Sequence, residues 1–511
     1  MFARILSGVV VGIDAREIEV QCDVSGGLPT FSIVGLPEKE VSESRERIRS
    51  ALKNSGFSFP AGRITANLAP ADLRKEGVGF DLAIAVAILM ATEQITRPQR
   101  RLLFVGELAL DGAVRGVRGV LPIAMEVGDD VDGLVVSHDN AAEAAVATDV
   151  PVYGVRTLHE VCSFLNGAQE IRPTEICING FSEQAEIIRH DLSEVRGQLQ
   201  AKRALEIAAA GGHNLLMVGP PGAGKSLLAR CLPELLPTFS RDESLEVTRI
   251  YSTAGLLEAG DALIPRRPYR APHHTISYAG MVGGGHGVPG PGEISLAHHG
   301  VLFLDELPEF DRKVLETLRQ PLEERSILLA RAGISVRYPA AFTLVGAMNP
   351  CPCGMLGDPE QTCTCSARDL MRYRRRLSGP FLDRIDLFVD VPRLPTDELF
   401  EPNACESSQE VRTRVDHARG TQWVRYEAVE GCYANAQLDG EALRIHCALN
   451  NEGNTLLRKA VARFALSARA YVRILRVART IADLEGADRV LGKHIAEAVQ
   501  YRASGLWMHN A

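Results

Sequence analysis

The chain contains 511 residues, of which 46% are hydrophobic and 23% charged, and its formal net charge is −8 at pH 7. This length exceeds what one hydrophobic core supports, so about two to four domains are expected. The ordinary composition and slightly acidic balance exclude a protein that coats nucleic acid through bulk positive charge, while local basic patches remain compatible with them.

The N-terminus and the cysteines indicate the compartment. The stretch from Ile5 to Ile13 is apolar for only a few residues and meets Asp14 at once, so a strand is predicted there rather than a signal peptide. No apolar run approaches the length of a membrane span. Eleven cysteines in a chain without a secretion signal indicate reduced thiols. A cytoplasmic protein that makes no membrane contact is expected.

The pattern along the chain predicts an α/β multidomain protein. Residues 1–165 alternate strand-like and helix-like stretches, as in an α/β or α+β domain. Residues 166–188 are polar and broken by glycine and proline, which is typical of a linker. Residues 189–392 read as a nucleotide-binding α/β core, in which 192–211 forms a helix, and residues 393–511 are mostly helical.

A complete P-loop occupies residues 219–226, after an apolar run that predicts a buried strand and before the start of a helix. Its glycines allow a tight turn whose N–H groups point at phosphate oxygens, and the helix dipole adds positive potential. Lys225 is expected to reach the β- and γ-phosphates of ATP, and the Ser226 hydroxyl to ligate Mg²⁺. The residues expected to bind the nucleotide are Gly219, Pro220, Pro221, Gly222, Ala223, Gly224, Lys225, Ser226 and Leu227.

Two further apolar runs end in polar side chains that suit the same site. Residues 301–304 precede Asp305, which is expected to hold Mg²⁺, and Glu306, which is expected to act as the general base. Asn349 ends the next run and could bond the γ-phosphate or the attacking water. The alternative for Asn349 is an ordinary turn residue before a proline.

Arg384 lies among apolar neighbours in the segment 380–386. It could be an arginine finger that stabilises the transition-state charge at the site of a neighbouring subunit. The alternative is a structural salt bridge with Asp383 or Asp386.

Four cysteines lie within a short loop that is rich in Gly, Pro, Asp and Thr, namely Cys351, Cys353, Cys363 and Cys365. Zn²⁺ takes four thiolates in a tetrahedron, and such a site would brace a loop that is too small to have its own core. Two C-x-C pairs are tighter than the commonest ligand spacing, and the alternative is reduced thiols without metal. A structural zinc site is predicted.

Taken together, these residues resemble the AAA+ superfamily, in the branch that contains magnesium-chelatase ATPase subunits and the MCM helicases. Segments 201–214, 270–275, 291–298 and 349–354 resemble the ComM/YifB family of magnesium-chelatase-like proteins, and the resemblance covers nearly the whole chain. It implies a ring-shaped homo-hexamer that uses ATP and Mg²⁺. It further implies a DNA helicase of branch migration in homologous recombination and natural transformation, with recombination proteins as further partners.

The resemblance also assigns roles to residues. Lys225 falls on Walker A, Asp305 and Glu306 on Walker B, Asn349 on sensor 1, and Arg384 on the finger that acts in trans. A sensor 2 arginine belongs on the lid helix 467–476. Arg469 is the first choice for it and Arg476 the second.

Residues 1–165 resemble the Lon protease domain, which has an S5-like α+β fold. Gly79 stands where that family has its nucleophilic serine, and Leu121 stands at the position of its catalytic lysine. Because a Ser–Lys mechanism needs both a nucleophile and an amine base, no peptidase activity is expected unless Gly79 or Leu121 is misaligned. A scaffold that forms the ring or binds DNA is expected instead.

Several segments are candidates for contact with single-stranded or branched DNA. Residues 453–482 contain seven Arg or Lys and no acidic residue, and Tyr373 lies within a run of arginines from Arg372 to Arg376. Two apparent insertions follow the pattern of channel loops in related ring ATPases. They are the predicted hairpin 327–338, with Arg331 near its tip, and the segment 252–292, with His273 and His274. For the two histidines, the alternative is local packing or turn capping.

Other functions remain open on the sequence. A metal-chelatase motor would need a partner with a metal-ion-dependent adhesion domain, and this chain has no Asp-x-Ser-x-Ser run. An AAA+ remodeller of protein substrates is the other alternative. Stimulation of ATP hydrolysis by DNA separates both from a DNA motor.

Overall fold

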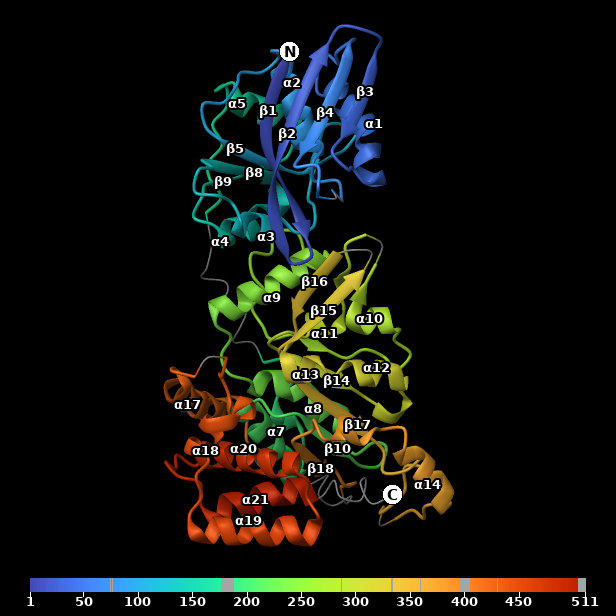
Figure 1. Cartoon of the computed structure of the whole chain (residues 1–511), viewed down its shortest axis with the longest axis vertical. Helices are drawn as coiled ribbons and strands as arrows, with labels where there is room; N and C mark the ends of the chain where they lie inside the picture. The colour runs from blue at the N-terminus through green and yellow to red at the C-terminus, as the bar shows by residue number, and fades with distance from the viewer. Residues whose placement is uncertain are drawn as a thin grey trace.

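The computed structural model describes residues 1–73, 75, 77–175, 188–285, 287–331, 334–358, 360–394, 405–429 and 431–503. The molecule is elongated, with an N-terminal part at one end, a sheet-centred core in the middle and a helical C-terminal part at the other end (Figure 1). Most of the predicted linker 166–188 lies outside the described residues. Among the described residues, no helix combines the length and the apolar character needed to cross a membrane.

The N-terminal part is built on a seven-stranded mixed sheet in the order β3-β4-β2-β1-β5-β8-β9. The β1–β2 and β2–β4 pairs are antiparallel and the other neighbours are parallel. The strands are β1 (Phe2–Val11), β2 (Asp14–Ser25), β3 (Thr30–Val34), β4 (Arg63–Ala69), β5 (Leu102–Val105), β8 (Gly133–Ser137) and β9 (Val152–Val155). The strand predicted from Ile5 to Ile13 corresponds to β1, which begins earlier, at Phe2, and ends at Val11.

Helices and a small ribbon complete this part. Every residue of α2 (Asp81–Ala91) is buried, because its sequence is apolar on all sides after Asp81 and it packs against the central strands. The other elements are α1 (Lys39–Asn54), β6 (Glu107–Leu108), β7 (Val114–Arg115), α3 (Val120–Met125), η1 (His138–Asn140), α4 (Ala141–Ala147) and α5 (Leu158–Leu165).

The core contains a five-stranded, all-parallel sheet in the order β11-β14-β17-β10-β18. The strands are β10 (Leu215–Val218), β11 (Tyr269–Arg270), β14 (Val301–Leu304), β17 (Thr343–Met348) and β18 (Leu387–Asp390). Apolar runs buried on both faces are typical of parallel sheets. Because β14, β17 and β10 are neighbours and run parallel, the segments after them meet at one edge. This arrangement fits the AAA+ fold that the resemblance implied.

Shorter elements surround this sheet. They are η2 (Leu192–Glu194), α7 (Leu199–Gly211), α8 (Lys225–Leu235), α9 (Arg241–Ala254), α10 (Tyr278–Val282), α11 (Glu293–Leu296), η3 (Leu307–Glu309), α12 (Arg312–Thr317), α13 (Pro321–Glu324), α14 (Ala367–Arg374) and α15 (Gly379–Leu382).

The helix predicted over 192–211 is present only from 199 to 211. Gly197 and Gln198 have φ of +55° and +51°, so α7 begins only at Leu199. Gln198 donates to the carbonyl oxygen of Pro392 at 2.7 Å, which fixes this turn.

The two predicted insertions of the core lie together. Strands β15 (Ser326–Arg331) and β16 (Ile334–Pro339) form an antiparallel hairpin, and β12 (Gly283–Gly284) pairs with β13 (Gly290–Pro291). The Tyr338 hydroxyl donates to the carbonyl oxygen of Pro289 at 2.8 Å, and the Arg331 guanidinium donates to that of Gly285. Segments that are far apart in the chain therefore form one projecting surface.

The C-terminal helices pack onto α7 and α8, so that one hydrophobic cluster spans both parts. They are α17 (Ser408–Tyr426), η4 (Asn435–Gln437), α18 (Gly440–His446), α19 (Asn451–Phe464), α20 (Ala468–Leu484) and α21 (Gly492–Ala503). Arg473 of α20 pairs with the buried Asp386, which precedes β18. Burial opposes ionisation of Asp386, but the Arg473 guanidinium outweighs it and holds the pKa of that carboxyl below its usual range. The helical part is thus bound firmly to the core.

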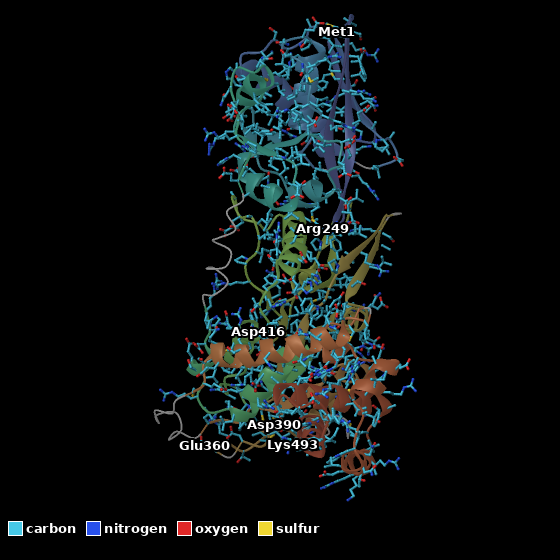
Figure 2. The ribbon with its side chains drawn as sticks, turned by 90° about the vertical axis from the view of Figure 1, so that its left-hand side faces the viewer. Met1, Arg249, Glu360, Asp390, Asp416 and Lys493 are labelled. Atoms are coloured by element: carbon cyan, nitrogen blue, oxygen red, sulfur yellow. The ribbon has the colours of Figure 1, made fainter. Side chains whose placement is uncertain are left out.

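Helix α9 joins the core to the N-terminal part, and Arg249 marks the junction in Figure 2. Arg249 donates to the carbonyl oxygen of Ile13 at 2.8 Å and pairs with Asp14. The Ser252 hydroxyl donates at 2.7 Å to the buried Glu143 carboxyl, and burial raises the pKa of that carboxyl. A polar contact of this kind, closed off from water, fixes the junction in one arrangement.

Candidate nucleotide-binding site

The P-loop connects β10 to α8 at the carboxyl edge of the core sheet. Gly222 and Gly224 have φ of +79° and +91°, a conformation that side chains rarely adopt, so the tight turn requires glycine there. The buried Lys225 ammonium donates to the carbonyl oxygens of Gly219 at 2.7 Å and Pro220 at 2.8 Å. Burial lowers the pKa of this ammonium. The turn therefore positions the lysine at the mouth of the loop.

The residues predicted to hold Mg²⁺ lie together. The Ser226 hydroxyl donates to a carboxylate oxygen of Asp305 at 2.7 Å. The Lys225 ammonium also donates to the Asn349 side-chain oxygen at 3.3 Å. Residues from three neighbouring strand ends thus converge, as a parallel sheet requires. Hydroxyl and carboxylate oxygens are the donors that Mg²⁺ prefers, so this pair fits that ion.

Glu306 lies next to this cluster in a strained conformation. Its φ is +51°, and its backbone N–H donates to Asp305 Oδ1 at 2.9 Å. The side chain is 59% exposed, and its Oε2 lies 3.5 Å from Nδ1 of His274. Backbone strain of this kind concentrates at functional sites. Glu306 can therefore reach a water beside the phosphates, and His274 can pair with it.

His274 is a site residue that sequence reasoning placed elsewhere, among the candidates for DNA contact. Its ring also packs edge-on against Phe310 with centroids 6.4 Å apart. The only available signal was its position after β11, the edge strand beside β14, because the ends of neighbouring parallel strands lie near each other. His274 therefore belongs to the surroundings of Glu306 in this structure.

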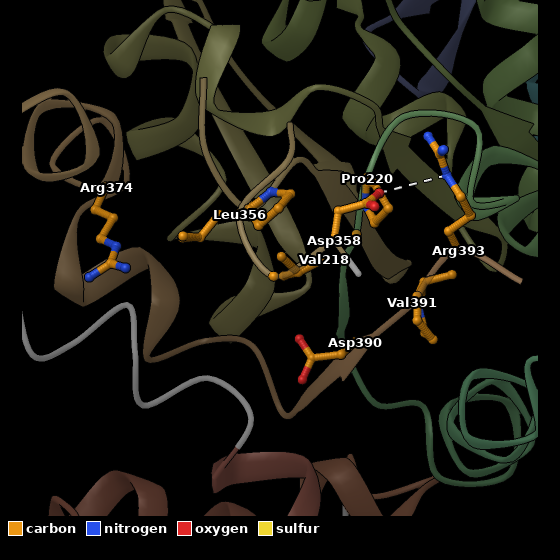
Figure 3. A pocket seen from close by; sticks show the side chains of 12 residues that line it. Val218, Pro220, Leu356, Asp358, Arg374, Asp390, Val391 and Arg393 are labelled. Carbon is orange, nitrogen blue, oxygen red and sulfur yellow. Dashed lines mark ion pairs between the residues drawn. The ribbon is translucent and has the colours of Figure 1, made fainter. Parts of the chain in front are cut away.

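A cavity of about 300 Å³ adjoins the P-loop (Figure 3). One wall is the start of the P-loop at Pro220, and another is the loop that follows Asn349, at Leu356 and Asp358. Arg393 closes a further side and lies 3.7 Å from the buried Asp358 carboxylate. This volume is at the lower end of small-molecule sites, which run from about 300 to 1,000 Å³.

The four cysteines of the following loop form a compact cluster. The Sγ–Sγ distances are 3.4 Å for Cys351–Cys353, 3.6 Å for Cys353–Cys363 and 3.7 Å for Cys351–Cys363. Cys365 belongs to the same group of ligand atoms. Four thiolates in a tetrahedron around Zn²⁺, with Zn–S of about 2.3 Å, lie about 3.8 Å from one another. The donor set and its spacing therefore fit a closed, structural zinc site.

The backbone favours thiolate at Cys353, whereas burial raises the pKa of the neighbouring Cys351 thiol. N–H groups of Met355 and then Thr364 bond the Cys353 sulfur and lower the pKa of that thiol to about 5. Metal binding needs deprotonated cysteine.

A second cluster that could suit a metal lies at the opposite, amino end of β14. Glu246 Oε2 lies 3.0 Å from Nε2 of His298 and 2.8 Å from Nε2 of His299. However, Nδ1 of His298 accepts the Ala341 N–H, so the proton of this neutral ring is on Nε2 and points at Glu246. Burial lowers the pKa of His298 to about 4, which keeps the ring neutral. The cluster is a set of hydrogen bonds between α9 and the residues before β14.

Arg384 is buried and internally bonded. Its guanidinium lies 2.6 Å from Glu323 and donates to the carbonyl oxygens of Arg319 and Pro380. The predicted alternative partners were wrong, because Asp386 pairs with Arg473 and Asp383 lies near Arg469 and Arg502.

The two candidates for sensor 2 lie in different surroundings. Arg469 is 62% exposed and lies 3.8 Å from Asp383, the residue before Arg384. Arg476 is largely buried and donates to the carbonyl oxygen of Leu438 at 2.6 Å. Arg469 is thus exposed beside Asp383, whereas the Arg384 side chain is buried against Glu323.

One candidate for DNA contact was wrong. Tyr373 is only 8% exposed, and its hydroxyl donates to the carbonyl oxygen of Asn349 at 3.2 Å. It supports the Asn349 turn and has no free face on which a base could stack.

The positions that the resemblance aligned with the Lon dyad lie inside the N-terminal part. Leu121 is fully buried, and a Cβ added at Gly79 would lie 3.5 Å from Val105. The nearby Ser44 hydroxyl accepts from Arg47 at 2.9 Å, and the buried Lys75 ammonium donates to the carbonyl oxygen of Pro70. These groups are occupied within the structure and do not form a dyad.

Comparison with known proteins gives the family. A model described as magnesium chelatase, subunit ChlI, matches residues 191–399. Models for subunit ChlI of Mg-chelatase and for the ChlI C-terminal region match residues 20–140 and 405–502. The chain is 45% identical to "Competence protein ComM" of Haemophilus influenzae, over 98% of this chain and 97% of that protein.

Two other relatives show a similar and a lower sequence identity. "Uncharacterized protein YifB" of Escherichia coli is 45% identical, over 96% of this chain and 95% of that protein. "Magnesium-chelatase 38 kDa subunit" of Cereibacter sphaeroides is 27% identical, over 59% of this chain and 87% of that protein. The chain therefore belongs to the ComM/YifB family of magnesium-chelatase-like AAA+ proteins.

Proposed function

We propose that this protein is an ATP-driven, hexameric DNA motor that promotes branch migration in homologous recombination and natural transformation. The observation that carries the proposal is the convergence of Lys225, Ser226, Asp305 and Asn349 at one sheet edge. These side chains suit Mg²⁺-dependent hydrolysis of ATP. Whole-length similarity to a competence protein favours DNA as the substrate.

Each residue at the sheet edge has a distinct part in hydrolysis. The P-loop N–H groups and Lys225 bind the phosphates, while Ser226 and Asp305 would hold Mg²⁺, which neutralises charge on them. Glu306 accepts a proton from the attacking water, and Asn349 orients that water or the γ-phosphate. Arg384 of a neighbouring subunit stabilises the charge that develops on the transferred phosphoryl group.

The adjacent insertions support a DNA-binding channel loop. The Arg331–Gly285 and Tyr338–Pro289 contacts tie the hairpin and the glycine-rich segment together, so they move as one. The hairpin carries the exposed Arg331 and Arg337. Such charges bind phosphates without regard to sequence. Closure of an ATP site and its release after hydrolysis would then shift this surface along DNA.

For the N-terminal part we propose a Lon-like scaffold without peptidase activity. Its contacts with α9 support a role in holding the ring or guiding DNA. Helix α9 also carries Glu246, which bonds His298 in the segment before β14. A displacement at the junction would therefore act on the amino end of β14, the strand that Asp305 and Glu306 follow.

We also propose a structural Zn²⁺ at Cys351, Cys353, Cys363 and Cys365. Protein purified without chelators is expected to contain about one zinc ion per chain, because a closed four-thiolate site binds tightly. Cys363→Ser should lower this content, whereas Cys405→Ser, a half-buried cysteine outside the cluster, should not. Elemental analysis of folded protein measures the outcome, and a metal-free wild type would remove the assignment.

The test of the DNA motor is branch migration of a labelled three- or four-strand junction by the purified protein. We expect ATP-dependent product with the wild type and none with Lys225→Ala, while Lys493→Ala, an exposed lysine of the C-terminal part, should behave as the wild type. ATP hydrolysis that neither responds to DNA nor moves junctions would favour a chelatase-like or protein-remodelling motor. The similarity to a magnesium-chelatase subunit makes this the second candidate.

A further inference from the structure

The cysteine cluster lies next to the candidate nucleotide site. Cys351 follows Asn349 by two residues, and the loop packs against the P-loop so closely that a Cβ at Gly354 would lie 2.7 Å from Pro221 Cδ. Farther along the loop, the buried Asp358 carboxylate lies 3.7 Å from Arg393, across the cavity beside the P-loop. The cysteine loop therefore packs against the P-loop and forms one wall of the cavity beside it.

We propose that the four-thiol cluster is an oxidation site, and that its conversion to disulfide expels the zinc ion and weakens nucleotide binding. This inference rests on the zinc site proposed above. It adds a disulfide bond and a loss of nucleotide affinity, neither of which follows from a zinc ion that only stabilises the loop.

The accessibility of the cysteine side chains decides which of them an oxidant reaches first. Cys353, Cys363 and Cys365 are half-buried, so a small hydroperoxide reaches them, while Cys351 is buried behind them. Outside the cluster, five of the described cysteines are buried, namely Cys22, Cys162, Cys231, Cys432 and Cys447. Buried thiols in apolar surroundings react slowly. Cys405 is half-buried like the loop thiols but lies outside the four-cysteine group, so disulfide formation should begin in the loop.

Cys353 and Cys363 are the pair best placed to react, because both are accessible and their sulfurs are 3.6 Å apart. One thiolate attacks a peroxide oxygen and becomes a sulfenic acid, and the second thiolate then displaces hydroxide from that sulfur. In sum, two thiolates, one hydrogen peroxide and two protons give one disulfide and two waters. Loss of two ligands leaves two thiolates, which are too few to retain Zn²⁺ tightly.

Formation of the bond also moves the loop. The two sulfurs must approach from 3.6 Å to the disulfide length of about 2.05 Å, and the remaining thiols lose the ion that held them. Gly354 and Asn349 lie on the same short loop, so their contacts with Pro221 and Lys225 are disturbed. Displacements of about 1 Å at a phosphate-binding site have large effects on function.

The experiment titrates hydrogen peroxide into the zinc-loaded, full-length protein. It follows released zinc with a chromophoric chelator, free thiols by titration, and the Kd for a fluorescent ATP analogue with Mg²⁺. We expect zinc release in step with thiol loss and about a tenfold or larger rise in Kd. A thiol reductant with added zinc should restore the original Kd.

Two variants make the result specific. Cys405→Ser should respond as the wild type, and Cys363→Ser should not form the Cys353–Cys363 disulfide in peptide mapping. Zinc release with an unchanged Kd would overturn this inference and leave the zinc site standing. A wild type that carries no zinc would overturn both, whereas the branch-migration assay with Lys225→Ala reports on the DNA motor independently of either.

Discussion

Glu306→Gln is expected to reduce ATP turnover by about 10²- to 10³-fold while ATP still binds, because the amide cannot accept a proton from the attacking water. The substitution keeps the size of the side chain and leaves the backbone bond to Asp305 in place. Lys225 and Ser226 are untouched, so the phosphate contacts persist. The measurement is steady-state release of phosphate alongside the Kd for ATP.

Glu309→Gln is the matched control for this experiment. It lies three residues away, pairs with Arg376 and has no contact with the P-loop in the described part of the chain. Its turnover should remain within about twofold of the wild type, as for most surface substitutions. Turnover by Glu306→Gln that equals that of Glu309→Gln would show that Glu306 is not the base.

The His274 contact has a further consequence for this site. At 3.5 Å from Glu306, the ring nitrogen lies where it can compete with water for the carboxylate. His274 follows β11 in the glycine- and histidine-rich segment that we propose to contact DNA. Engagement of that segment can therefore alter how freely Glu306 meets the attacking water.

The nucleotide site could be predicted from the sequence because its residues follow buried parallel strands. Asp305 and Asn349 come directly after apolar runs, Lys225 ends the P-loop that follows a third, and the carboxyl ends of neighbouring strands meet. The hairpin at 326–339 could also be predicted, since alternation and a central glycine mark it locally.

The remaining features depend on packing between distant segments. Tyr373 in a run of arginines gave the pattern of an exposed base-stacking residue, yet α14 turns it inward to support Asn349. The Glu323 partner of Arg384 comes from a different helix, and the contact of the cysteine loop with Pro221 joins two loops. Periodicity and spacing along one chain contain no signal for such contacts.

Arg384→Ala is expected to lower ATP turnover by about 10³-fold or more, the range for arginine fingers, if Arg384 serves the site of the next subunit. Its internal bonds predict a second effect, because loss of the guanidinium leaves Glu323 and two carbonyl oxygens without their donor. Glu323→Gln removes the ion pair but keeps the arginine. It should therefore reproduce the part of any loss of thermal stability that comes from the ion pair, but not the loss of turnover.

Mixed rings separate the two roles of Arg384. Neither Arg384→Ala nor Lys225→Ala hydrolyses ATP alone, but in a ring of both, some interfaces join an intact P-loop to an intact finger. Random mixing in equal amounts gives about one quarter of such interfaces, so turnover should recover to about that fraction of the wild-type rate. A purely structural arginine gives no recovery, because the defect then stays within each subunit. Recovery would require that the Arg384 guanidinium exchanges Glu323 for the nucleotide of a neighbour, and the Glu323 side chain is 55% exposed, so this pair lies where a neighbour can reach it.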